Sequence, residues 1–145
     1  MADPLVIHSD LELHLTTWYR AALSARSEPV CAGVVVSNRE PAGTPKDPFP
    51  KRLVVIRDDG GPDTSLLTAT RSVGISVFAG TQENPADAIQ LALIVHALRN
   101  QIPSTDPSNP VAALLGSNGP YPVSDAQPIA RRYLTLSLAV VARAL

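Results

Sequence analysis

The sequence is poor in several residue types on which common classes of protein depend. Among 145 residues there is one cysteine, Cys31, so the chain forms no internal disulfide and no thiolate zinc cluster. Twelve Lys and Arg residues balance 13 Asp and Glu, and the net charge of −1 gives no long-range attraction to DNA or an anionic membrane. No apolar run reaches the ~18 residues that a membrane span needs. We therefore expect no membrane association.

Motifs for catalysis and cofactor binding are also missing. The three histidines are His8, His14 and His96, and the spacing of six between the first two is not that of a helical zinc pair. Neither a G-x-S-x-G nucleophile turn nor a G-x-G-x-x-G phosphate loop occurs. These absences favour a protein that is not an enzyme and binds no cofactor.

The distribution of proline divides the chain. The hydrophobic content of 45% is sufficient for a core, and the length predicts a single domain over residues 1–145. Ten of the 14 prolines fall in residues 38–50 and 103–128. Proline lacks an amide donor and fixes φ, so we expect long loops at 38–50 and 103–128.

Two segments have the periodicity of amphipathic helices. Residues 9–26 predict the first helix, in which Ser9 and Glu12 have the spacing of a capping box. Its apolar residues recur at spacings of three and four: Leu11, Leu15, Trp18, Ala22 and Ala25. Residues 85–102 predict the second helix, with Asn84 as N-cap. Its apolar stripe consists of Leu91, Ile94, Val95, Leu98 and Ile102.

Strands are predicted between these helices and loops, at residues 32–37, 52–57, 70–78 and 132–143. The last strand alternates, so its even-numbered leucines (Leu134, Leu136 and Leu138) should be buried. The turn-forming residues 58–63 should join the second and third strands into an antiparallel hairpin. The sequence therefore predicts an α+β fold, with a small mixed or antiparallel sheet and both helices packed on one face.

The acidic cluster of Asp58, Asp59 and Asp63 has two interpretations. Carboxylates are ligands for Mg²⁺ or Ca²⁺ and can act as general acids or bases. However, residues 60–62 are Gly-Gly-Pro, which a tight turn needs for backbone reasons. We favour a structural turn or a subunit contact, with a small metal-dependent enzyme as the alternative.

Two further segments are candidates for contact with a partner. Arg131, Arg132 and Tyr133 form a basic-aromatic cluster that suits nucleic acid, a subunit interface or lumen, or a solvated strand end. Residues 111–115 (VAALL) are an apolar pentad inside the second long loop, which favours contact with another subunit. The candidate interface residues are therefore Val111, Leu114, Leu115, Arg131, Arg132, Tyr133, Asp58 and Asp59.

The order of motifs over residues 51–145 resembles a known family. The quoted stretches are RLVVIRDDGGPDTSLLTATRSVGISVFAGTQENPADAIQLALIVHAL, then NGPYPV, then RRYLTLSLAVVARAL. Together they are similar to the tail terminator (tail completion) proteins of long-tailed phages, in particular those of actinobacterial phages. None of these motifs is chemically specific, and their order and spacing carry the resemblance.

The resemblance implies a structural function. A tail-terminator-like subunit would form a ring, typically a hexamer, on the head-proximal end of the tail tube. The ring would end tube polymerisation and provide the surface for joining the head. The implied partners are further copies of the chain, the major tail tube protein and a head-completion or neck protein, while DNA passes through the lumen without specific binding. The implied location is the virion tail, after assembly in the host cytoplasm. The alternative is a neck or head-completion connector, because such proteins share a similar small α+β fold.

Overall fold

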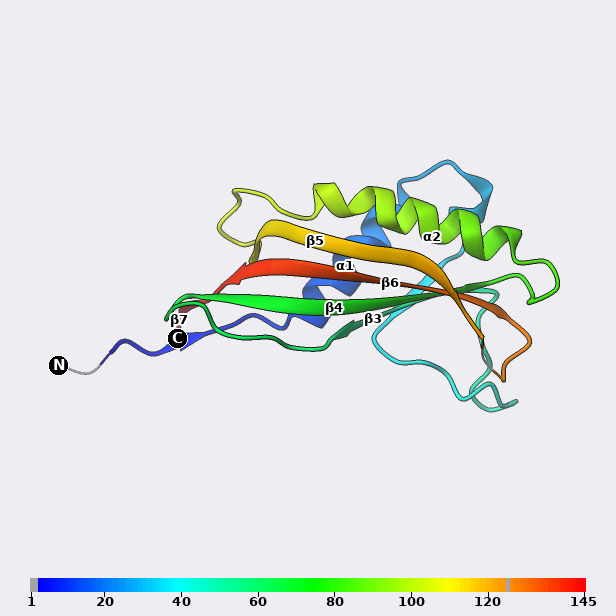
Figure 1. Ribbon diagram of the computed structural model, residues 1–145, viewed down its shortest axis with the longest axis horizontal. Helices are drawn as coiled ribbons and strands as arrows, with labels where there is room; N and C mark the ends of the chain where they lie inside the picture. The colour runs from blue at the N-terminus through cyan, green and yellow to red at the C-terminus, as the bar shows by residue number, and fades with distance from the viewer. Residues whose placement is uncertain (1–2, 125) are drawn as a thin grey trace.

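The computed structural model describes residues 3–124 and 126–145, which form a mixed sheet with two helices (Figure 1). The elements are β1 Val6–Ile7, α1 Leu11–Ser24, β2 Val35–Ser37, β3 Arg52–Asp58, β4 Thr68–Ala79, α2 Ala86–Leu98, β5 Val111–Val123, β6 Ala130–Val141 and β7 Arg143–Ala144. Short 3₁₀ turns lie at Pro29–Cys31 and Arg99–Gln101. The main sheet has the order β2-β3-β4-β6-β5, in which only β2 and β3 are parallel. The predicted α+β class with a mixed sheet is confirmed.

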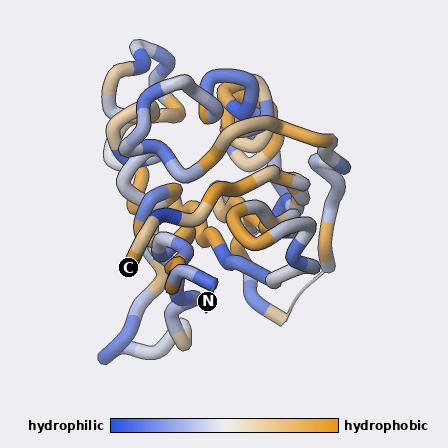
Figure 2. The backbone as a smooth tube through the Cα atoms, turned by 90° about the vertical axis from the view of Figure 1, so that its left-hand side faces the viewer, coloured by the Kyte–Doolittle hydropathy of each residue, from blue (hydrophilic) through white to orange (hydrophobic). Residues whose placement is uncertain are grey.

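Both helices pack on the same face of this sheet, which we call the helix face. Helix α1 lies against β2 and β3, and α2 lies against β4, β6 and β5. One core cluster joins Leu15 and Tyr19 of α1, Leu91 and Val95 of α2, and the inward residues of the strands. The strand residues in it include Val54, Ile56, Val73, Ile75, Leu134, Leu136 and Leu138. The predicted burial of the even-numbered leucines of β6 is therefore confirmed. Figure 2 shows hydrophobic stretches of backbone running through the middle of the molecule.

The opposite face of the sheet, here called the outer face, is only partly covered. Leu53, Val55 and Phe78 form a small second cluster, against which Phe49 and Ile129 pack. Phe49 comes from the first proline-rich loop, whose residues 38–50 contain only an isolated bridge between Thr44 and Asp47. This loop therefore covers one end of the outer face and leaves the rest open.

Strands β3 and β4 form the predicted antiparallel hairpin. Ile56 lies opposite Ile75, and Asp58 lies opposite Val73. The connection, residues 59–67, is shorter than the gap between the predicted strands 52–57 and 70–78, because β3 extends to Asp58 and β4 begins at Thr68. A backbone bridge between Asp63 and Ala69 orders part of this connection.

The second proline-rich segment is a correction to the sequence analysis. Residues 103–128 were predicted to be a loop, but they contain the 13-residue strand β5 at an edge of the sheet. Its pairing with β6 shifts register at three places, and one shift contains the cis Gly119–Pro120 bond. An edge strand with bulges tolerates prolines because part of its backbone needs no partner. Only residues 103–110 and 124–129 connect the elements on either side.

The helix starts also differ from the predicted ones. Asp10, not Ser9, caps α1, because its carboxylate accepts a hydrogen bond from the amide of Leu13 at 3.0 Å. Glu12 forms no capping box and accepts instead from the amide of Asp58 at 2.8 Å, which ties α1 to the end of β3. Helix α2 begins at Ala86, one residue later than the start at Pro85 that an N-cap at Asn84 would give.

Candidate interaction site on the outer face

The pairing register brings polar and aromatic side chains together on the outer face. Side chains alternate between faces along a strand, so Val55, Ser76, Tyr133 and Tyr121 form one row across β3, β4, β6 and β5. Next to this row the surface is hollowed into a cavity of about 360 Å³. We call it the outer-face groove. Its polar and aromatic lining consists of Arg57, Asp59, Ser76, Tyr121, Arg131 and Tyr133.

Glycine at position 74 makes room for the central side chain of the groove. A Cβ atom at Gly74 would lie 2.3 Å from the Tyr133 hydroxyl and 3.1 Å from Oδ2 of Asp59. The Tyr133 phenol therefore lies over Gly74 of β4, and any residue with a side chain at position 74 would displace it. The Tyr121 ring meets the Tyr133 ring edge to face, with 5.7 Å between centroids. Burial, and secondly the Asp59 carboxylate, raise the pKa of Tyr133, so its hydroxyl stays protonated.

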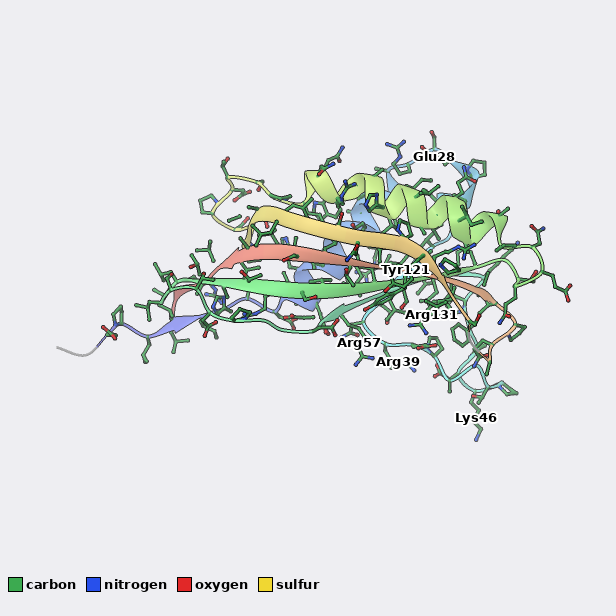
Figure 3. The ribbon with its side chains drawn as sticks, in the orientation of Figure 1. Glu28, Arg39, Lys46, Arg57, Tyr121 and Arg131 are labelled. Carbon is green, nitrogen blue, oxygen red and sulfur yellow. The ribbon has the colours of Figure 1, made fainter. Side chains whose placement is uncertain are left out.

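The two arginines of the groove are held differently. Arg131 donates to the Ser76 hydroxyl at 3.0 Å, and its guanidinium lies 5.3 Å from the centre of the Phe78 ring. These contacts fix its position. Arg57 is exposed, and within residues 3–124 and 126–145 its guanidinium has no hydrogen-bond or ion-pair partner. Figure 3 shows Arg57 and Arg131 on the side of the sheet away from α2.

The predicted basic-aromatic cluster is divided between the two faces. Arg131 and Tyr133 line the outer-face groove, whereas the side chain of Arg132, which pairs with Val77, belongs to the helix face. Three adjacent residues in a strand cannot share one surface. Arg57 and Tyr121 were not among the predicted contact residues, because their place in the groove follows from strand register.

The three carboxylates of the predicted acidic cluster take different partners. Asp58 accepts from the amide of Gly60 at 2.8 Å, which is a turn contact. Asp59 faces the groove, and Asp63 lies 3.4 Å from the guanidinium of Arg71. In the described part of the chain no three His, Cys, Asp or Glu side chains gather as metal ligands would.

The apolar pentad 111–115 was predicted to lie in a loop, but it belongs to β5 and is not a single exposed patch. Val111 is fully buried in the main core, and Leu114 packs partly against it. Leu115 is 56% exposed and lies at one of the register shifts of β5. Of the three predicted apolar contact residues, Leu115 therefore offers the most surface to a partner.

A different apolar surface lies at the end of the molecule formed by β1, β7 and the β3–β4 connection (Figure 1). We call it the terminal patch, and it consists of Leu5, Ile7, Leu66, Leu67, Val141 and Leu145. Backbone hydrogen bonds join Leu145 to Leu5 and Ala142 to Leu67, so these segments are neighbours. Half of the 12 exposed large hydrophobic residues of the described chain belong to this patch. Exposed apolar area concentrated in this way is typical of an interaction surface.

Comparison with family models and with curated proteins finds no match to this chain. No helix within residues 3–124 and 126–145 is long and apolar enough to cross a bilayer. The function must therefore be argued from the surfaces described above and from the sequence resemblance.

Proposed function

We propose that this chain is a structural subunit that forms a closed ring on the head-proximal end of a phage tail tube. The ring ends tube polymerisation and presents the surface to which the head joins. The observation that carries the proposal is the terminal patch, where Leu5 and Leu145 are 73% and 76% exposed. Exposed apolar side chains concentrated at one end of the molecule favour a subunit that works in an assembly.

A ring also needs a second surface on each subunit. In a cyclic assembly larger than a dimer, each subunit meets its neighbours through two different, complementary surfaces. The terminal patch and the free edge of β5, where Leu115 is exposed, are separate surfaces of this kind. A patch on the order of 400 Å² contributes about 10 kcal/mol when buried, before the cost of association. That value supports a ring that forms on the tube rather than one that is stable alone.

The test is complementation of a phage that lacks the gene. We expect the L66D/L67D variant to give abnormally long tails, because two charges in the terminal patch prevent its burial. The matched control is Leu93→Asp, since Leu93 is 54% exposed but lies on α2, outside the patch. The control should restore normal tails.

Three results are informative. Normal, infectious particles with the L66D/L67D variant would show that the terminal patch makes no assembly contact. Normal tail length in the absence of the protein, with heads that fail to join, would favour the neck or head-completion connector. Tails and heads that are both normal without the protein would refute both assembly functions.

A further inference from the structure

The composition of the outer-face groove is that of a protein-binding hot spot. Two guanidinium groups and two phenol rings surround the cavity, and Val55 and Val123 supply apolar wall. Arginine and tyrosine are among the residues most enriched at the positions that dominate binding energy in protein interfaces. The tyrosine hydroxyls and arginine N–H groups select polar partners, while the tyrosine rings and the methyl groups of the two valines bury apolar area.

We propose that the outer-face groove binds a segment of a partner protein that presents an acidic side chain beside an aromatic or apolar one. The unpaired guanidinium of Arg57 donates hydrogen bonds to the partner's carboxylate. Arg131, which contacts Ser76 and the Phe78 ring, places a second cation in the same lining. The Tyr121 and Tyr133 rings pack against the neighbouring aromatic or apolar side chain. The proposal does not depend on the phage assignment.

The same groove is poorly suited to nucleic acid. Asp59 places a carboxylate in the lining, so the two arginines leave a net charge of only +1. No lysine lines the groove, and the whole chain has a net charge of −1. Nucleic-acid affinity arises largely from several phosphate contacts, whereas one carboxylate needs only one or two cations.

The negative charge of Asp59 also restricts where in the groove an acidic side chain can bind. The acidic side chain of the partner must approach from the Arg57 and Arg131 side and avoid Asp59. The protonated hydroxyl of Tyr133 and the Asp59 carboxylate both lie close to Gly74, on the side of the lining that the partner's acidic side chain avoids. The groove therefore selects a segment with one well-placed acidic side chain.

The test uses the full chain labelled with ¹⁵N and three probes, titrated separately at one salt concentration. The probes are the peptide acetyl-Glu-Phe-Glu-amide, the matched neutral peptide acetyl-Gln-Phe-Gln-amide, and tetrathymidylate. We expect the acidic peptide to shift the side-chain N–H signals of Arg57 and Arg131 in a saturable way. The neutral peptide should bind several-fold more weakly.

Variants then separate the groove from general charge effects. Arg57→Gln should weaken binding of the acidic peptide about threefold to fivefold, as expected for one solvent-exposed ion pair. Arg143→Gln makes the same charge change on β7, at the far end of the molecule, and should leave the affinity unchanged. Unchanged melting temperatures would show that both variants are folded.

The proposal is overturned if the acidic and neutral peptides bind equally, or if neither shifts the arginine signals. It is equally overturned if the two variants weaken binding to the same extent. Tighter binding of tetrathymidylate than of the acidic peptide would assign the groove to nucleic acid instead.

Discussion

Tyr19 links the two helices beneath the surface, and removing its hydroxyl group tests how they are held together. The side chain is fully buried, and its hydroxyl donates to the carbonyl oxygen of Val95 in α2 at 3.0 Å. Burial raises the pKa of Tyr19, so the group remains a donor at any ordinary pH. At the end of α2 the amide of Arg99 donates to the carbonyl oxygen of His96. The Tyr19 hydroxyl is therefore the partner of the Val95 carbonyl in the last turn, where carbonyls lack partners within the helix.

The magnitude follows from what Tyr19→Phe leaves behind. The ring remains, so no cavity of side-chain size opens, but a buried carbonyl loses its partner. A lost hydrogen bond of this kind costs about 1–1.5 kcal/mol. For a chain of this size the melting temperature should fall by about 3–5 °C. Urea unfolding followed by circular dichroism measures the free energy, with the slope expected to be unchanged.

The matched control is Tyr121→Phe, which makes the same chemical change at a residue that is 44% exposed. Its stability should stay within about 0.5 kcal/mol of the unmodified protein. If Tyr19→Phe were as stable as this control, the contact between the helices would be purely apolar and the argument from the hydroxyl would be wrong.

Three further changes test the sheet, the first loop and the β3–β4 connection. Leu136→Ala should lower the free energy of unfolding, measured in urea, by about 2–5 kcal/mol because Leu136 is buried. A loss under about 1 kcal/mol would contradict the strand register. The control is Leu93→Ala, since Leu93 is exposed. The guanidinium of Arg39 lowers the pKa of Asp47 to about 2, so the loop contact is complete above pH ~4 and is lost as the pH falls through 2. Amide exchange in residues 38–50 should report this transition, and Arg39→Gln should move it towards pH 4. Gly61→Ala should destabilise the hairpin, because the added methyl group would lie 2.1 Å from a backbone carbonyl oxygen of β4; unchanged stability would mean that the connection shifts freely.

Local sequence patterns were sufficient for most of the secondary structure. The two helices and strands β3, β4 and β6 were predicted because their apolar residues recur at the helical or strand period. The predicted buried face of α1 was only partly right. Leu11 and Leu15 are buried, but Tyr19 and Leu23 complete the buried side, while Trp18 and Ala22 lie at its margin. Periodicity alone does not fix how far a helix rolls against its sheet.

Strand β5 was missed because its local chemistry is that of a loop. Proline is confined to the edges and bulges of a sheet and glycine weakens a strand, and sequence alone does not show that a strand will occupy an edge. Similarly, Glu12 has the spacing of a helix cap but bonds to the end of β3, 46 residues away, because the folded chain brings that amide within reach.

The sequence by itself determined the class of fold and the buried alternation of β6. Those properties depend on residue type and on spacings of a few positions. Tertiary structure alone decided which polar residues share a surface. Strand pairing separated Arg132 from Arg131 and brought Arg57, Tyr121 and Tyr133 together from three different strands. The groove depends on register across four strands, and register is set by the packing of the whole sheet rather than by any one segment.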